Sequence, residues 1–234
     1  EDETQEALCR NAERIKIISQ ERIIDELNKI MLSPAPSIGF IELERCGLLE
    51  LILPEIAALR GTESRNGRAH KDNFYHTLEV LENVCKQQSA DDKIKDDDKT
   101  LWLRWSALLH DIGKGWPGDH AVAGEVIARD VAARLGLDHH DVAVVARLVR
   151  HHLLLVETAT RRDLDDPATV RAVADAVGTQ GTLELLHALT EADALATGPA
   201  AWSSWRASLV ADLVKRVSAV LSGEVPADPA ETAL

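Results

Sequence analysis

The stretch Trp102–His120, WLRWSALLHDIGKGWPGDH, joins an apolar run to a short polar motif. Its first half has Trp, Leu and Ala at helical spacing, which predicts a buried helix. His110 and Asp111 follow at the end of this run, and Lys114 and a Gly- and Pro-containing turn come next. A buried apolar helix gains nothing from two ligating side chains at its end, because burying such groups costs free energy unless something compensates them. We therefore expect a binding site at this point.

Apolar residues recur at helical spacing through most of the chain. Several of these runs end at Gly, which is a common helix stop. No run alternates with a period of two over a length that would indicate a strand. The sequence therefore predicts an all-α fold, with helices expected over residues 21–32, 74–86, 101–113, 121–136, 140–154, 167–178, 182–196 and 201–223.

The composition restricts the class of protein. The chain has 234 residues, of which 45% are hydrophobic but only 3% aromatic. No run approaches the roughly 18 apolar residues of a membrane span, and the acidic first residues do not fit a signal peptide. We therefore expect a cytoplasmic protein with no membrane contact.

Charge and cysteine content argue against two further classes. The formal net charge is −13, with 22 acidic against 16 basic residues up to residue 114 and 17 against 10 after it. Neither part has the basic excess that binding a phosphate backbone requires, so tRNA is not an expected partner. Cys9, Cys46 and Cys85 are odd in number and widely spaced, which predicts reduced packing residues rather than a disulfide framework or a zinc site.

Two further residues extend the site predicted at His110 and Asp111. His76 lies in one predicted helix, and Asp193 lies in the otherwise apolar run LELLHALTEADALA. A carboxylate beside a buried helix face is costly unless a cation compensates it. Two imidazoles and two carboxylates form a mixed nitrogen and oxygen set that suits divalent metals. We therefore expect one or two divalent ions, with Mn, Fe, Co, Ni, Zn and Mg all open.

A second ion has its own candidate ligands. His120 follows the turn after Lys114, and His151 lies at the end of the run DVAVVARLVRHH. Asp111 could bridge two ions through its two oxygens, and a hydroxide between such ions is a strong nucleophile towards a phosphoryl group. Lys114 would then supply a point charge to the phosphate. Of the other histidines, His152 stays open as a ligand, His139, His140 and His187 are expected at the surface or in packing, and His70 is expected in a loop.

The composition changes sharply near residue 114. Eight of the nine Lys and twelve of the thirteen Ile lie at or before it, whereas sixteen of the eighteen Val follow it and Ala rises from 8 to 24. Helix packing does not force these exchanges, so different coding histories explain them better. The polar segments at 61–73 and 91–99 are expected to be a linker and a solvated loop.

The ordered pattern of His76, HDIGK at 110–114 and Asp193 resembles the HD superfamily of metal-dependent phosphohydrolases. These are all-helical proteins that hydrolyse phosphomonoesters and phosphodiesters. The resemblance covers roughly residues 70–222. It implies an HD-domain helical bundle preceded by an N-terminal helical extension, with Asp111 and Lys114 as catalytic residues.

Finer resemblances divide near residue 114. The segment 12–61, AERIKIISQERIIDELNKIMLSPAPSIGFIELERCGLLELILPEIAALRG, is similar to the region after the catalytic head of bacterial CCA-adding tRNA nucleotidyltransferases. The segment 110–137, HDIGKGWPGDHAVAGEVIARDVAARLGL, resembles the HD domain of bifunctional PII uridylyltransferase/uridylyl-removing enzymes. In that family the HD domain removes UMP from a tyrosine of the PII signal protein.

Two resemblances that meet inside one motif, together with the change in composition, suggest an engineered chimera of about 1–114 and about 110–234. The predicted parts are a helical segment at 1–62, an HD domain at 63–222 and a frayed tail at 223–234. The resemblance implies a divalent-metal-dependent phosphohydrolase with residual uridylyl-removing activity, acting on a phosphate-ester or nucleotide substrate and on uridylylated PII. Two alternatives stay open: a chimeric HD scaffold that binds metal without selected activity, and a vestigial tRNA-binding module.

Overall fold

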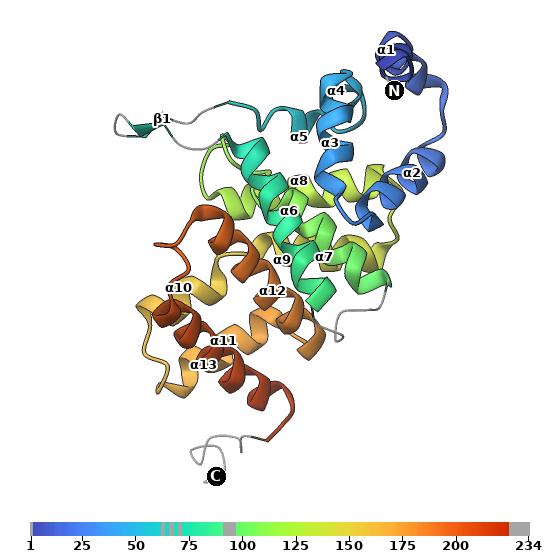
Figure 1. The fold of residues 1–234 in the computed structure, drawn as a ribbon. Helices are drawn as coiled ribbons and strands as arrows, with labels where there is room; N and C mark the ends of the chain where they lie inside the picture. Colours follow the sequence, from blue (N-terminus) through green and yellow to red (C-terminus); the bar gives the residue numbers. More distant parts are fainter. Residues whose placement is uncertain (1, 62–63, 66–67, 70–71, 91–96, 225–234) are drawn as a thin grey trace. The chain divides into compact units, whose positions relative to one another are not determined.

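The computed structural model describes residues 2–61, 64–65, 68–69, 72–90 and 97–224 (Figure 1). The chain divides into two compact units between Arg150 and His151. The all-α prediction is confirmed, because helices form all the regular structure of the described residues except one hairpin. That antiparallel hairpin, β1 (Ser64–Arg65) and β2 (Arg68–Ala69), was not predicted. No helix in the described part is both long and apolar enough to cross a membrane.

The N-terminal unit begins with a series of short helices that proline and glycine interrupt. Pro36 and Pro54 each stand at the start of a helix, where the missing N–H has no partner to lose. Gly47 separates two helices in the left-handed conformation, with φ 72°. The elements are α1 (Asp2–Arg10), η1 (Ala12–Ile17), α2 (Gln20–Leu32), α3 (Pro36–Arg45), α4 (Leu48–Ile52) and α5 (Pro54–Ala57).

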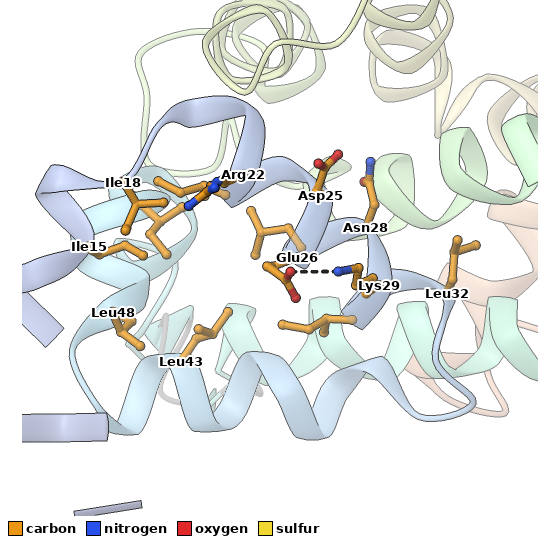
Figure 2. Close-up of a pocket in the computed structure, with 14 residues that line it drawn as sticks. Ile15, Ile18, Arg22, Asp25, Glu26, Asn28, Lys29, Leu32, Leu43 and Leu48 are labelled. Carbon is orange, nitrogen blue, oxygen red and sulfur yellow. Dashed lines mark hydrogen bonds and ion pairs between the residues drawn. The ribbon is translucent and has the colours of Figure 1, made fainter. Parts of the chain in front are cut away.

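These helices leave an apolar pocket open to solvent (Figure 2). Helical spacing places Ile23, Leu27, Ile30 and Met31 on one face of α2. The structure buries Leu27 and Met31 in the core, but Ile23 and Ile30 are half-buried and line the pocket. The face of α2 that looks towards α3 and α4 is therefore only partly covered.

Two long helices, α6 (Asn73–Ala90) and α7 (Asp97–Leu109), pack against each other in the same unit (Figure 1). Helix α2 packs on α7, and α3 packs on α6. The expectation of a solvated loop over 91–99 is wrong for its last three residues, which begin α7, and 91–96 lie outside the described residues. The unit continues through α8 (His120–Arg134) and α9 (His139–His151), whose last residue belongs to the next unit.

Buried polar contacts attach α7 to the N-terminal helices. The guanidinium of Arg104 is buried, donates to Gln88 Oε1 over 2.8 Å and to the carbonyl of Ser33 over 2.9 Å, and also contacts the carbonyl of Met31. These carbonyls lie at the C-terminal end of α2, where a positive charge is favourable. A guanidinium with three acceptors satisfies most of its donors, so its burial is compensated.

Residues from before and after position 114 also pair within this unit. The guanidinium of Arg134 donates to both carboxylate oxygens of Glu55 over 2.7 Å each, linking α8 to α5. The indole of Trp102 donates to Asp141 Oδ1 over 2.7 Å, linking α7 to α9. The two compositional halves of the chain therefore make specific polar contacts with each other.

The C-terminal unit contains α10 (Leu154–Arg161), α11 (Pro167–Val177), α12 (Gln180–Thr197) and α13 (Ser204–Leu221). Helix α13 packs on the other three helices. The helices predicted at 167–178, 182–196 and 201–223 are confirmed to within three residues. The predicted run 140–154 is broken by a turn after α9. Residues 225–234 of the expected tail and the loop histidine His70 lie outside the described residues.

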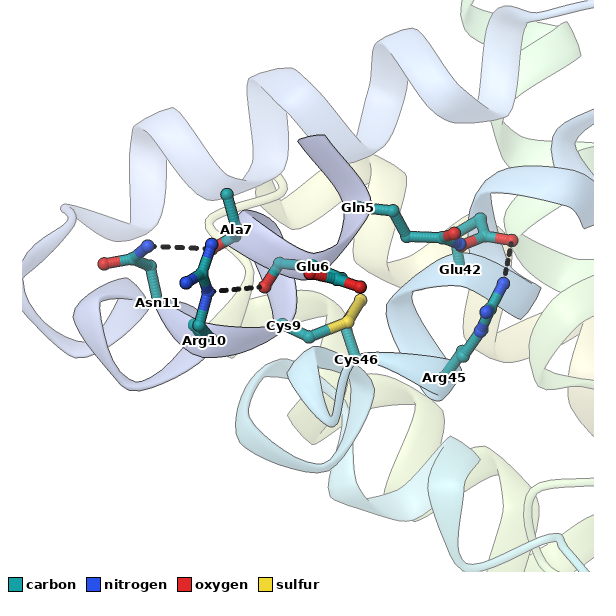
Figure 3. The surroundings of a disulfide bond; sticks show 9 residues. All are labelled: Gln5, Glu6, Ala7, Cys9, Arg10, Asn11, Glu42, Arg45 and Cys46. Atoms are coloured by element: carbon teal, nitrogen blue, oxygen red, sulfur yellow. Dashed lines mark hydrogen bonds and ion pairs between the residues drawn. A yellow bond between two sulfur atoms is a disulfide. The ribbon is translucent and has the colours of Figure 1, made fainter. Parts of the chain in front are cut away.

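Cys9 and Cys46 are joined in a disulfide, so the prediction that all three cysteines are reduced is wrong for this pair (Figure 3). The pairing connects α1 to the end of α3, and the side chains of Gln5 and Glu42 meet beside it. Spacing along the sequence did not reveal the pair, because only the path of the intervening helices brings the two residues together. Cys85 is free and buried as expected, and burial raises the pKa of its thiol to about 11.

The two compact units do not follow the segments 1–62, 63–222 and 223–234. Those segments were defined by resemblance, whereas the units reflect which helices pack together. The first unit contains both the N-terminal helices and α6 to α9. The three-part division therefore stays a prediction.

Candidate metal centre

His110 and Asp111 occupy the turn that directly follows α7, and both are buried. The Nδ1 atom of His110 lies 2.8 Å from the carbonyl oxygen of Ala107. A carbonyl can only accept, so Nδ1 is the donor, and in the neutral imidazole Nε2 carries the lone pair. This Nε2 lies 3.2 Å from Asp111 Oδ2. A lone pair and a carboxylate oxygen repel at this distance unless a proton or a cation lies between them.

His76 approaches the same carboxylate oxygen from α6. Its Nε2 atom lies 3.8 Å from Asp111 Oδ2, and its ring meets that of His110 edge to face with centroids 5.5 Å apart. The ligand atoms that the two histidines offer are within 4.8 Å of each other. The sequence prediction that His76 lies with the HD dipeptide agrees with this geometry.

Lys114 and His120 complete the cluster within the N-terminal unit. The Lys114 ammonium lies 2.5 Å from Asp111 Oδ2 and 3.4 Å from Asn73 Oδ1. His120 Nε2 lies 3.8 Å from the other carboxylate oxygen, Oδ1. Oδ2 therefore faces two histidines and a lysine, whereas Oδ1 faces a third histidine. Sequence reasoning missed Asn73, although its position three residues before His76 on α6 is a signal that could have found it.

The turn between His110 and α8 is held closely at its base. Gly113 lies so near α8 that a Cβ on it would stand 2.0 Å from the carbonyl oxygen of His120 and 2.5 Å from the backbone nitrogen of Gly124. Asp119 caps α8 by accepting from the backbone N–H of Ala121 over 2.8 Å, and this hydrogen bond lowers the pKa of its carboxyl. The start of α8, which carries His120, is thereby fixed beside Asp111.

The spacing of these donor atoms fits a bound cation. Ligands about 2.1 Å from an ion in tetrahedral or octahedral geometry lie roughly 3.0–3.4 Å from one another. The separations of His110 and His76 from Asp111 Oδ2, 3.2 Å and 3.8 Å, are close to this range. The backbone hydrogen bond at His110 Nδ1 is also the arrangement by which proteins orient a histidine ligand. The chain therefore has His and Asp groups that could bind a divalent metal.

The remaining predicted ligands, Asp193 and His151, belong to the C-terminal unit. In α12 the side chains of Leu186, Leu189 and Thr190 are buried and Asp193 is half-buried, so this carboxylate lies beside the buried face as the helical spacing predicted. His151 is half-buried at the end of α9. Their roles as ligands stay predictions.

Of the other histidines, His152 is buried, His139 and His140 are exposed, and His187 is half-buried with a pKa lowered by burial.

The family model for the HD domain matches residues 73–197, more than half of the chain. The chain therefore belongs to the HD domain family, the metal-dependent phosphohydrolases, and its His and Asp cluster lies inside the matched region. A second model, described as the probable RNA and SrmB-binding site of polymerase A, matches residues 1–59. Both matches confirm resemblances that the sequence indicated, and their pairing agrees with the chimera interpretation.

Among known proteins, the chain is similar to bifunctional uridylyltransferase/uridylyl-removing enzymes. That of Streptomyces coelicolor is 60% identical over 210 residues, which is 89% of this chain and 24% of the relative. That of Mycobacterium tuberculosis is 43% identical over 206 residues, or 87% of this chain and 25% of the relative. The chain thus spans about a quarter of the length of these relatives. Alignments of this extent cross residue 114, so these relatives also have a counterpart to part of the first segment.

Proposed function

We propose that the chain is a divalent-metal-dependent phosphodiesterase that removes uridylyl groups, acting at the cluster around Asp111. The observation that carries this proposal is the approach of His76 Nε2 and His110 Nε2 to one oxygen of a buried carboxylate. The names of its relatives include a uridylyl-removing enzyme, which supplies the substrate class. The family and the relatives do not favour a metal-binding scaffold without activity or a vestigial tRNA-binding module.

The proposed metal ligands are His76, His110, Asp111 and Asp193. His120 and His151 are the proposed ligands of a second ion, and Asp111 would be a ligand of both ions. When bound, a divalent metal supplies positive charge that stabilises a phosphoryl group in the transition state and lowers the pKa of water. The proposed ion is Mn, Fe, Co, Ni, Zn or Mg.

The chain's own residues orient the site and hold the substrate. The carbonyl of Ala107 keeps the proton of His110 on Nδ1 and so directs the Nε2 lone pair towards Asp111. The side chain of Lys114 is partly exposed and its ammonium contacts the buried carboxylate, so it can bind a phosphoryl oxygen as a point charge. Asn73 accepts from the same ammonium and limits its range of positions.

The proposed substrate is a phosphate ester that carries a uridylyl group. Uridylylated PII protein is the proposed macromolecular partner, on the strength of the HD resemblance over 110–137. The net charge of −13 gives no support to a tRNA partner. A cytoplasmic setting stays a prediction.

The test is hydrolysis by the purified chain loaded in turn with Mn²⁺, Co²⁺, Ni²⁺ and Mg²⁺. Substrates are bis(4-nitrophenyl) phosphate and uridylylated PII, and metal content per chain is measured by elemental analysis. We expect His110→Ala and Asp111→Ala to abolish hydrolysis and reduce metal content, Asp193→Asn to do so in part, and the exposed control His139→Ala to do neither. A folded wild-type chain that binds metal but hydrolyses neither substrate with any ion refutes the proposal in favour of an inactive scaffold.

A further inference from the structure

Among the described residues, three large aromatic side chains are exposed: Tyr75 at 42%, Trp116 at 61% and Trp205 at 62%. Trp116 is the one that lies on the turn between Lys114 and His120, both of which contact Asp111. Two residues of chain span at most about 7 Å, so the Cα of Trp116 lies no farther than this from that of Lys114. The turn that carries Lys114 and His120 therefore also carries an exposed indole, attached to the backbone within two residues of the proposed phosphate-binding lysine.

The backbone of the turn holds Trp116 in place. Its N–H donates to the carbonyl of Gly113 over 3.2 Å, and Gly113 itself is in tight contact with the start of α8. Gly115 and Gly118 adopt φ of 86° and 90°, which lets the chain turn sharply on both sides of the indole. A turn fixed at its base and carrying an exposed ring offers a preformed surface, which costs little ordering on binding.

We propose that Trp116 is a stacking platform for the nucleobase of the uridylyl group, an inference that rests on the proposed function. A nucleotide ester places a flat aromatic base at a short distance from its phosphate. Stacking on an aromatic side chain is a common way in which proteins hold an unpaired base, and it tolerates any base because every base has a π face. Lys114 would hold the phosphate and Trp116 the base. The two residues together would select nucleotidyl esters over simple phosphate esters.

Scattered exposed apolar side chains are normal on protein surfaces, so exposure alone decides nothing. Trp205 shows this. It lies on α13 and is as exposed as Trp116, but in the sequence it is far from every residue that contacts Asp111. Trp116 differs from both other aromatic residues because it lies two residues after the proposed phosphate-binding lysine, whereas Tyr75 lies on α6 next to the proposed metal ligand His76. Trp205 is accordingly the matched control.

The experiment compares two substrates that share one leaving group. They are the 4-nitrophenyl ester of UMP and the same ester of ribose 5-phosphate, which lacks the base. We compare kcat/KM for the nucleotide ester with kcat/KM for the ribose ester. For Trp116→Ala we expect this ratio to fall by about ten-fold because KM for the nucleotide ester rises, a typical loss for one stacked base. Trp116→Phe should restore most of the ratio, and Trp205→Ala should leave it at the wild-type value.

Binding of UMP and of ribose 5-phosphate to the Mn²⁺-loaded chain, measured by calorimetry, gives a readout that needs no turnover. Trp116→Ala should weaken UMP binding by a similar factor. An unchanged ratio in both measurements overturns the inference, as does an equal loss for both ligands. A loss confined to uridylylated PII would show that Trp116 contacts the protein and would also overturn it. Absence of hydrolysis in the wild-type chain would refute the proposed function, while the calorimetry would still decide the role of Trp116.

Discussion

Replacing Gly113 with Ala is expected to destabilise the N-terminal unit and to loosen His120 from the cluster. Gly113 does not have a positive φ, so the backbone itself tolerates alanine. The added Cβ, however, would stand 2.0 Å from the carbonyl oxygen of His120 and 2.5 Å from the backbone nitrogen of Gly124. Both atoms belong to the backbone of α8, and no side-chain rotation can relieve the overlap. The start of α8 must therefore move by at least about 1 Å before the contact reaches 3.0 Å.

The size of the effect follows from this geometry. Overpacking a well-packed site costs typically 1–3 kcal/mol, and displacement of a helix backbone belongs at the upper end, about 3 kcal/mol. With a urea m-value of about 2 kcal/mol/M, the unfolding midpoint should fall by roughly 1.5 M. The assay is urea unfolding followed by far-UV circular dichroism, together with Mn²⁺ content of the folded variant.

Gly124→Ala is the matched control on the other side of the same contact. Its Cβ would meet Val149 Cγ1 at 3.2 Å, which is a side-chain atom that can shift. Alanine also improves the helix interior by up to about 1 kcal/mol relative to glycine. We expect its midpoint to stay within about 0.5 M of wild type. A wild-type midpoint for Gly113→Ala, or an equal loss for both variants, would refute the reasoning from close backbone approach.

Three further predictions concern other parts of the chain. Arg134 lowers the pKa of Glu55 from 4.5, so their ion pair stabilises the fold above that pH and its contribution is lost as the pH falls through the lowered value. Glu55→Gln should thus lower the unfolding free energy by about 0.5 kcal/mol at pH 7, since the pair is partly exposed, and not in acid; equal losses at both pH values would contradict this. Reduction of the Cys9–Cys46 disulfide, which spans 37 residues, should lower the unfolding free energy by up to about 4 kcal/mol, and identical urea midpoints with and without reductant would count against it. Lys114→Met should cut kcat at least about ten-fold while metal content stays at the wild-type level; a parallel loss of metal would instead indicate that Lys114 positions Asp111.

The helices could be predicted because they depend on local periodicity. The place of Asp193 beside buried residues follows from the helical spacing of Leu186, Leu189 and Thr190. Likewise, the end of α7 at Leu109 delivers His110 and Asp111 together to one turn. Both features follow from residues that are close together in the sequence.

Other features depend on contacts that no local pattern encodes. The pairing of Cys9 with Cys46 requires the path of α1, α2 and α3 in space. The hairpin at β1 and β2 has strands of two residues, too short for alternation to be recognised. The charged residues from Asp97 were read as loop, yet acidic residues suit the first turn of a helix. The hydrogen bond that sets the tautomer of His110 likewise became visible only in three dimensions.

The buried guanidinium of Arg104 bears on how the chain can be shortened. Trimming to the family-matched range 73–197 would remove the carbonyls of Met31 and Ser33 and leave this cation with Gln88 as its remaining partner among those described above. The buried charge of Arg104, six residues before His110, would then lack most of its compensation. Hydrating it would require α7, the helix that precedes the HD dipeptide, to separate from its neighbours. The smallest autonomous piece that keeps the metal cluster is therefore larger than the region by which the family is recognised.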